Sequence, residues 1–172
     1  VHEAGCNTFI IHARKAWLKG LSPKENRDIP PLNYERVLEL KKLMPNLNIS
    51  INGGIKTLEH AKELLTQLDG VMIGRAAYEN PWMLKEADSL IYNTQDPIWK
   101  NRKELLTAYL PYVEQELSQG CPLTIITRHL SSLFNGIPGS RKYRQMLSEQ
   151  APKAKDGVEL LQKAMAFVEE IG

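Results

Sequence analysis

The sequence contains little cysteine and no long hydrophobic run. Only 2 of its 172 residues are cysteine, and neither a CxxC pair nor a histidine cluster at metal-binding spacing accompanies them. This pattern argues against a disulfide framework and against a bound metal, and it is typical of a reducing compartment. The apolar runs are far shorter than the ~20 residues that span a bilayer, and no secretory leader opens the chain. We therefore expect a cytoplasmic protein without a membrane segment.

The charges nearly cancel, but they are unevenly distributed. Lysine and arginine number 22 against 20 aspartate and glutamate, a formal net charge of +2. Residues 12–27 nevertheless hold 5 basic side chains against the single acid Glu25, and residues 128–144 hold 4 basic side chains and no acid. Such clusters are solvated faces in many proteins, and they also attract phosphate-rich partners such as nucleic acid.

The first part of the chain alternates short β-branched runs with helical patterns, which indicates βα units and a parallel sheet. Strands are expected at residues 8–12, 48–51 and 70–73. Apolar residues at three- and four-residue steps predict helices over residues 34–44 and after Thr57, which can cap the second of them. A short helix is expected over residues 76–87, which completes three βα units.

The strand patterns end before residue 95. The remainder shows helical patterns separated by proline and glycine, which predicts an all-α domain over residues 95–172 behind an α/β domain over residues 1–94. The last of these helices is expected to run from about residue 152 to Ile171.

Two glycine motifs directly follow predicted strands. Asn52, Gly53 and Gly54 come after the second strand, and Gly74 and Arg75 come after the third. In (β/α)8 barrels the loops after the last two strands commonly form a phosphate site with a short helix N-terminus. Glycine lets backbone N–H groups approach an anion, and an arginine adds a charge-assisted contact. Glycine is also common in tight turns that bind nothing, but the two motifs together favour a phosphate site.

His12 stands at the carboxyl end of the first predicted strand, which is the end where barrel ligands bind. A solvated or packed histidine is the simpler interpretation of one such residue. The loop of some twenty residues after it favours a functional role, since long loops in compact domains are usually active-site or binding elements.

Four strings together resemble the tRNA-dihydrouridine synthases, closest to their A subfamily, over nearly the whole chain: HARKAWLKGLSPKENRDIPPL, NGGI, GRAAYENPW and RHLSSLFNGIPGSRKYRQMLSE. The resemblance implies an enzyme with FMN on the C-terminal face of a (β/α)8 TIM barrel, NADPH as reductant, and a helical domain that grips tRNA. It implies that reduced flavin passes a hydride to C6 of a uracil while a cysteine protonates C5. The chain would be the C-terminal part, with about three βα units of the barrel followed by the all-α domain.

Residue by residue, the resemblance implies that His12 contacts the flavin and that the two glycine motifs hold its phosphate. The family's catalytic cysteine, a lysine near the flavin and the first FMN-binding loop belong to an N-terminal half that this chain lacks. The resemblance therefore implies no catalytic residue in the chain and no activity for the chain alone. Cys6 precedes the first strand and Cys121 lies in the helical domain, so we interpret both as buried small hydrophobes.

The two basic stretches supply the expected tRNA contacts. Lys24 and Arg27 resemble family positions that meet tRNA, and Trp17 and Tyr143 can stack on bases or simply pack. The full set of expected phosphate contacts is Arg14, Lys24, Arg27, Arg128, Arg141 and Arg144.

Two other functions stay open at this point. The phosphate motifs also fit another barrel flavoprotein that acts on a free pyrimidine or similar small molecule, although the basic helical domain argues against it. A catalytically inactive RNA-binding remnant is the third possibility. Because three βα units cannot close an eight-stranded barrel, we also expect open sheet edges to favour a homo-oligomer.

Overall fold

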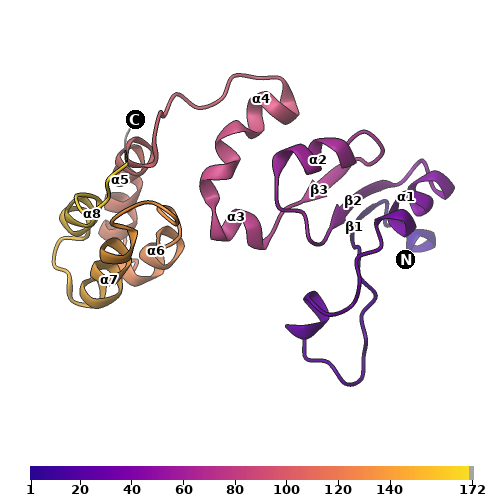
Figure 1. Ribbon diagram of the computed structural model, residues 1–172, viewed down its shortest axis with the longest axis horizontal. Helices are drawn as coiled ribbons and strands as arrows, with labels where there is room; N and C mark the ends of the chain where they lie inside the picture. Colours follow the sequence, from indigo (N-terminus) through magenta and orange to yellow (C-terminus); the bar gives the residue numbers. More distant parts are fainter. Residues whose placement is uncertain (171–172) are drawn as a thin grey trace. The chain divides into compact units, whose positions relative to one another are not determined.

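A computed structural model describes residues 1–170 of the chain, which form two compact units. The first unit comprises Val1–Ala77 and Glu86–Gln95, and the second comprises Tyr78–Lys85 and the chain from Asp96 onward. The sheet belongs to the first unit, and helices α5 to α8 belong to the second (Figure 1). The sequence places a domain boundary beside Gln95, but it gives no signal that Tyr78–Lys85 packs with the later helices.

A parallel sheet of three strands lies at the centre of the first unit. The strands are β1 (Thr8–His12), β2 (Asn48–Asn52) and β3 (Gly70–Met72), in the order β1-β2-β3. His12 pairs with Asn52, and Asn52 pairs with Met72. The three expected strands are therefore confirmed, and their carboxyl ends meet at one edge of the sheet.

Helices α1 (Tyr34–Leu43) and α2 (Leu58–Leu64) follow the first two strands. Each helix is preceded by a side chain whose oxygen accepts a hydrogen bond from a backbone N–H of the first turn. Such a cap stabilises a helix by roughly 1 kcal/mol. Asn33 accepts from the Arg36 N–H in α1, and Thr57 accepts from the His60 N–H in α2, as the sequence predicted for Thr57.

The core of the first unit lies between the sheet and these helices. Ile49 and Ile51 of β2 are fully buried, and Val37 of α1 and Leu64 of α2 pack in the same cluster. Burying one such aliphatic side chain is worth about 1.5–3 kcal/mol. This core fixes β2, so the loop that follows Asn52 starts from a rigid point.

The prediction of a single helix over residues 76–87 is wrong. The structure has α3 (Arg75–Glu79), then a 3-10 segment (Pro81–Glu86), then α4 (Ala87–Tyr92). Pro81 accounts for the break, because it lacks the N–H that an α-helix needs at each interior position. Two further 3-10 turns are short: His2–Ala4 and Glu25–Arg27.

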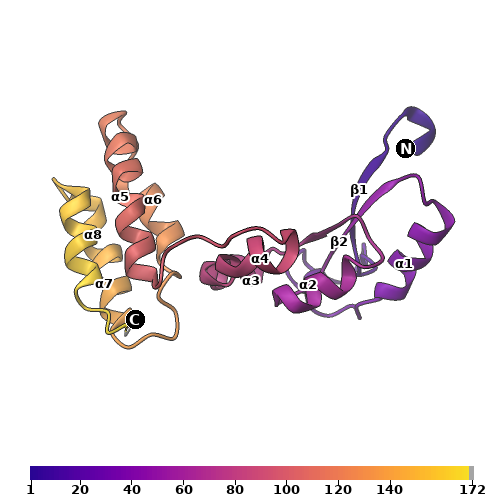
Figure 2. The ribbon, with the colours of Figure 1, turned by 90° about the horizontal axis from the view of Figure 1, so that it is seen from above.

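The second unit gathers four helices (Figure 2), which are α5 (Arg102–Ser118), α6 (Leu123–Leu130), α7 (Ser140–Gln150) and α8 (Gly157–Met165), with a 3-10 turn at Ala151–Lys153. The expected final helix is too long at both ends. Asp156 accepts from the Glu159 N–H and so begins α8 at Gly157, and the helix ends at Met165. The expected end at Ile171 lies outside the described residues. No helix among residues 1–170 is long and apolar enough to cross a membrane.

An aromatic pair lies in the core of the second unit. The rings of Phe134 and Tyr143 are fully buried and meet edge to face, with centroids 4.8 Å apart. The Tyr143 hydroxyl donates to the Leu130 carbonyl at 3.2 Å, which satisfies its polar end. Beside them, Gly139 has φ +84°, and a Cβ there would collide with the Phe167 carbonyl oxygen.

We predict that Gly139→Ala destabilises the protein by roughly 3 kcal/mol, since it combines left-handed backbone strain with a clash against backbone. Gly120→Ala is the matched control: Gly120 has φ +86° but no atom within 4 Å of its would-be Cβ, so only strain of about 1 kcal/mol is expected. Urea unfolding of both variants measures the difference. Equal losses of stability would contradict the close packing at Gly139.

Candidate functional site

The predicted phosphate motifs and His12 lie on the three loops at the carboxyl edge of the sheet. His12 ends β1, and Asn52 ends β2, where its carbonyl accepts the Ala13 N–H at 2.7 Å. Gly74 follows β3 and immediately precedes α3. The parallel register therefore brings residues from three loops to one edge, as the sequence predicted.

The turn after β2 favours glycine at both Gly53 and Gly54. Their φ values are +123° and +70°, which strongly disfavour any residue with a Cβ. A Cβ on Gly53 would lie 3.2 Å from His12 Cε1, and one on Gly54 would collide with Leu32. The Tyr34 hydroxyl donates to the Gly53 carbonyl at 2.7 Å and holds the turn from α1. Sequence patterns did not point to Leu32 or Tyr34 as residues of this turn, because both contacts arise only on folding.

The backbone at this edge offers free donors. Among residues 1–170, the N–H groups of Gly54 and Gly74 form no turn or loop hydrogen bond with another backbone group, and both residues are exposed. The Nε of Arg14 is also buried without a hydrogen-bond partner. Because a buried donor without a partner costs free energy, the Arg14 Nε marks a place where a ligand or water supplies the acceptor. This arrangement fits an anion.

His12 is held as a neutral hydrogen-bond donor. Its Nδ1 accepts the Arg14 backbone N–H at 3.2 Å, which leaves the ring proton on Nε2. Partial desolvation lowers the pKa of His12 below its ordinary value, and the positive charges of Arg14 and Arg75 lower it further. At neutral pH the ring therefore donates through Nε2 and carries no charge.

Arg75 is paired with a carboxylate from the long loop after β1. Its Nη1 lies 2.7 Å from Oδ1 of Asp28, and its Nη2 donates to the Arg27 carbonyl at 3.4 Å. The hydrogen bond from Arg75 lowers the pKa of the Asp28 carboxyl. The Asp28 carboxylate oxygen therefore contacts the Arg75 guanidinium where a phosphate oxygen would bind. The sequence did not single out Asp28.

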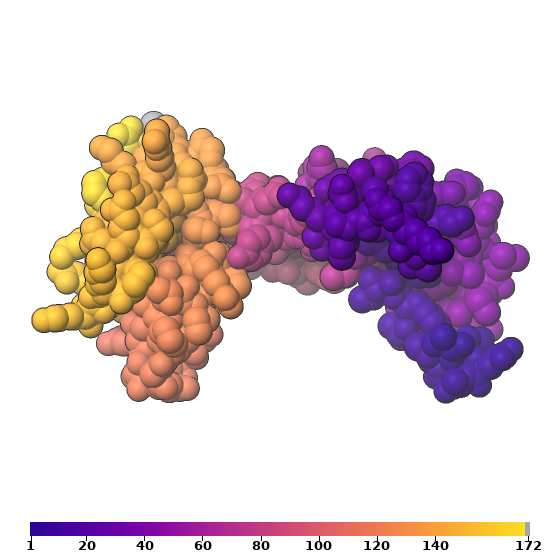
Figure 3. All heavy atoms as spheres, turned by 90° about the horizontal axis from the view of Figure 1, so that it is seen from below, coloured from indigo at the N-terminus to yellow at the C-terminus, as the bar shows by residue number. Residues whose placement is uncertain are grey.

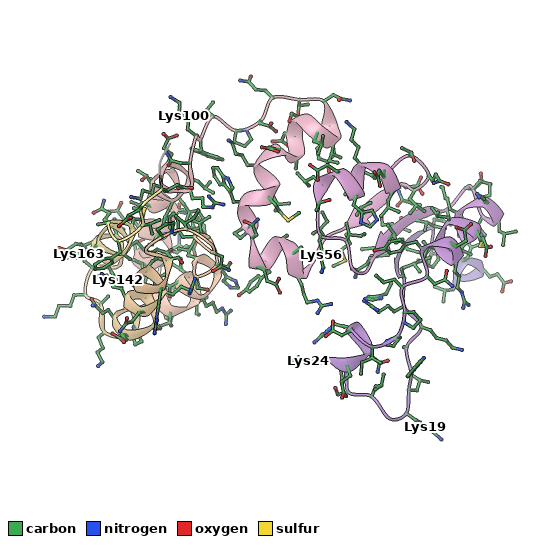
Figure 4. All side chains as sticks on the ribbon, in the orientation of Figure 1. Lys19, Lys24, Lys56, Lys100, Lys142 and Lys163 are labelled. Atoms are coloured by element: carbon green, nitrogen blue, oxygen red, sulfur yellow. The ribbon has the colours of Figure 1, made fainter. Side chains whose placement is uncertain are left out.

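The long loop, residues 13–33, is closed at its base. The Asn33 N–H donates to the Ala13 carbonyl at 2.7 Å. The Arg14 guanidinium donates to the carbonyls of Asp28 and Pro30. Figure 4 shows Lys19 and Lys24 on this loop, well away from the sheet. Arg14 is therefore engaged in holding the loop, whereas Lys24 and Arg27 are exposed.

The basic residues predicted in the second unit lie at its surface. Arg128, Arg141 and Arg144 are all exposed. Arg144 also donates to Oδ1 of Asn135 at 2.8 Å, and Asn135 in turn donates to the Glu79 carbonyl at 2.9 Å. Arg144 therefore has a structural partner as well as an exposed charge.

The burial of Tyr143, Cys6 and Cys121 decides three expectations from the sequence, and for Tyr143 it confirms packing, one of the two roles left open. Tyr143 cannot stack on a base, because its ring is fully buried and burial raises the pKa of its hydroxyl. Cys6 and Cys121 are half-buried, so neither is fully buried as the sequence predicted, although Cys121 packs against the core of the second unit. Neither cysteine lies among the loops at the carboxyl edge of the sheet. Among residues 1–170, no cluster of histidine, cysteine and acidic side chains is arranged to hold a metal.

We predict that Arg75→Gln raises the pKa of His12, since it removes one of the positive charges that disfavour protonation of the ring. The value should stay below the ordinary 6.5, because desolvation and Arg14 remain. Lys56→Gln, a change of the same charge on the loop after Gly54, should leave it unchanged. NMR titration of the imidazole signals measures both variants. An unchanged His12 pKa in Arg75→Gln would contradict the proximity of the two side chains.

Comparisons with known proteins agree with the resemblance. The model of the dihydrouridine synthase (Dus) family matches residues 1–170. A tRNA-dihydrouridine(20/20a) synthase of Pasteurella multocida is 53% identical over 168 residues, covering 98% of this chain and 51% of the relative. One of Yersinia pestis is 54% identical over 169 residues, covering 98% and 49%. The chain spans about half the length of these curated relatives, and with this match along residues 1–170 it belongs to the dihydrouridine synthase family.

Proposed function

We propose that the chain is the C-terminal portion of an FMN-dependent tRNA-dihydrouridine synthase, an oxidoreductase that reduces a uridine of tRNA to dihydrouridine with NADPH. One observation carries the proposal: His12, the Gly53-Gly54 turn and Gly74-Arg75 lie at one edge of a parallel sheet in a chain of this family. The names of the relatives support tRNA as the substrate. The residues at the sheet edge support FMN as the cofactor.

The donors at this edge fit the phosphate of FMN. The N–H groups of Gly54 and Gly74, which form no turn or loop hydrogen bond, would bind phosphate oxygens, with Asn52 and Gly53 leading into the turn. Arg75 would supply the opposite charge, exchanging Asp28 for phosphate. The neutral His12 would donate its Nε2 proton to an acceptor on the flavin. When bound, FMN supplies hydride transfer, and the chain's own residues bind and orient it.

We propose that the three βα units are part of a (β/α)8 TIM barrel. A cavity of about 790 Å³ beside α1 and the carboxyl end of β1 supports this, because β1 is an edge strand of the sheet. Its lining includes Leu40 and Leu43 of α1 and Trp17 of the long loop, apolar surface that a preceding βα unit would cover. In the chain by itself, this surface and the exposed Ile10 of β1 would favour a homo-oligomer through the sheet edges.

We propose that the α-helical residues 95–172 form a tRNA-binding domain. A uridine must leave its stack to reach a flavin, which costs a few kcal/mol that phosphate contacts elsewhere offset. The exposed Arg128, Arg141 and Arg144 supply such contacts in this proposal, and Lys24 and Arg27 supply them in the first unit. The low cysteine content fits a cytoplasmic location.

The chain by itself should be inactive. The proposed chemistry needs a general acid beside the flavin, and neither of the two cysteines lies at the carboxyl edge of the sheet. Loss of a positioned general acid typically costs 10²- to 10⁴-fold in rate. The isoalloxazine ring would also lack most of the walls that bury a ligand. We therefore assign the acid to a part of the enzyme outside this chain.

We predict that Arg75→Ala, made in the complete gene product, weakens FMN binding by roughly 10- to 100-fold, since a hydrogen bond to a charged group is worth about 1.5–3 kcal/mol. tRNA binding should change far less. Lys56→Ala is the control for loss of one positive charge nearby. Flavin fluorescence released during gel filtration measures retention. A variant that keeps its flavin as firmly as the wild type would contradict the assignment of Arg75 to the phosphate.

A further inference from the structure

Tyr34 contacts the turn that the proposed function assigns to the flavin phosphate. In Figure 3 the long loop, residues 13–33, lies in dark purple at the front of the first unit, and α1 begins with Tyr34 where that loop ends. We propose that Tyr34 is a positioning residue for this site: its hydroxyl holds the Gly53 carbonyl and so aims the Gly54 N–H at a phosphate monoester. The inference rests on the proposed function, because that function places a phosphate at the turn.

The hydrogen bond from Tyr34 fixes the peptide plane between the two glycines. The hydroxyl donates to the Gly53 carbonyl at 2.7 Å, and the peptide bond from Gly53 to Gly54 is trans. In a trans peptide the C=O and the N–H that follows it lie in one plane and point in opposite directions. The Gly54 N–H therefore points away from the Tyr34 hydroxyl, and a rotation of this peptide would break the bond from Tyr34.

The turn needs such an anchor because two consecutive glycines leave the backbone free to rotate. Gly53 has φ +123° and Gly54 has φ +70°, and neither has a Cβ to limit the alternatives. Among residues 1–170, the Gly54 N–H forms no turn or loop hydrogen bond with another backbone group. The bond from Tyr34 orders this donor before an anion arrives, which lowers the entropy cost of binding.

Tyr34 is itself held in place by α1 and α2. It is the first residue of α1, and the side chain of Asn33 caps that helix by accepting the Arg36 N–H. The Asn33 N–H donates to the Ala13 carbonyl at 2.7 Å, which ties the start of α1 to the end of β1. The His60 ring of α2 lies 5.5 Å from the Tyr34 ring between centroids, and Tyr34 packs against the core of the first unit. The hydroxyl therefore has a fixed position under the turn.

The Tyr34 hydroxyl remains a donor at neutral pH. Partial burial raises its pKa above the ordinary 10.0, and the positive charge of Arg14 opposes this only in part. The side of the turn that carries Tyr34 is also occupied by Leu32, because a Cβ on Gly54 would collide with Leu32 and lie 3.3 Å from the Tyr34 hydroxyl. The phosphate therefore approaches from the opposite side, toward which the Gly54 N–H points.

The test compares FMN with riboflavin, which has the same ring system and no phosphate. The complete gene product is freed of its flavin and titrated with each ligand, and the quenching of flavin fluorescence gives Kd. Tyr34→Phe removes only the hydroxyl. It should raise the Kd for FMN about 10-fold, since a hydrogen bond to a charged group is worth at least about that factor. The Kd for riboflavin should not change.

A matched variant and two spectroscopic measurements isolate the role of the hydroxyl. Tyr92→Phe removes the hydroxyl of a tyrosine that is 69% exposed at the end of α4, and it should leave both Kd values unchanged. The phosphorus-31 signal of bound FMN should move in Tyr34→Phe, whereas the visible absorbance of the ring should not. In the wild type, the Gly54 amide proton should shift downfield with FMN and stay in place with riboflavin.

The outcomes separate this inference from the proposed function. A complete gene product that binds neither flavin would overturn both. FMN binding that is tighter than riboflavin binding but unchanged in Tyr34→Phe would remove the role of Tyr34 and leave the proposed function standing. An equal loss of affinity for both ligands in Tyr34→Phe would show a purely structural role. A Gly54 amide signal that FMN does not move would contradict the aimed donor without any variant.

Discussion

Parallel pairing of His12 with Asn52, and of Asn52 with Met72, is the constraint on which the site depends. It places the ends of three strands side by side, so that loops far apart in sequence begin at one edge. The fully buried Ile49 and Ile51 hold the middle strand in this register. A slip of one residue would turn those side chains out of the core, which makes the register expensive to change.

The loops at that edge are linked by polar contacts that hold charge in fixed places. The Arg14 guanidinium closes the long loop, and the Arg14 backbone N–H fixes the tautomer of His12. The ion pair between Asp28 and Arg75 joins the same loop to α3. Both arginines disfavour protonation of His12. The Asp28–Arg75 pair is exposed, and exposed ion pairs contribute little to stability, so in the proposed function an incoming phosphate would replace the carboxylate at little cost. The proposed site would therefore be ordered before an anion binds.

Sequence patterns were sufficient where the signal is local. β-branched runs predicted the strands, and glycines directly after them predicted the turn at Gly53. Patterns failed where one residue overrides a periodicity, as Pro81 does by ending α3. They also could not find contacts between distant segments. The Tyr34 bond to Gly53 and the Asp28 pair with Arg75 join residues that come together only in the folded chain.

Uridine reduction is the most direct measure of the proposed function. Unmodified tRNA, FMN and NADPH are incubated with the 172-residue chain or with the complete gene product, and dihydrouridine is then measured by mass spectrometry of the digested tRNA. The complete gene product should form dihydrouridine, and the chain by itself should stay at background. A complete gene product that reduces no tRNA uridine would contradict the proposed function, and an active 172-residue chain would contradict the placement of the general acid outside it.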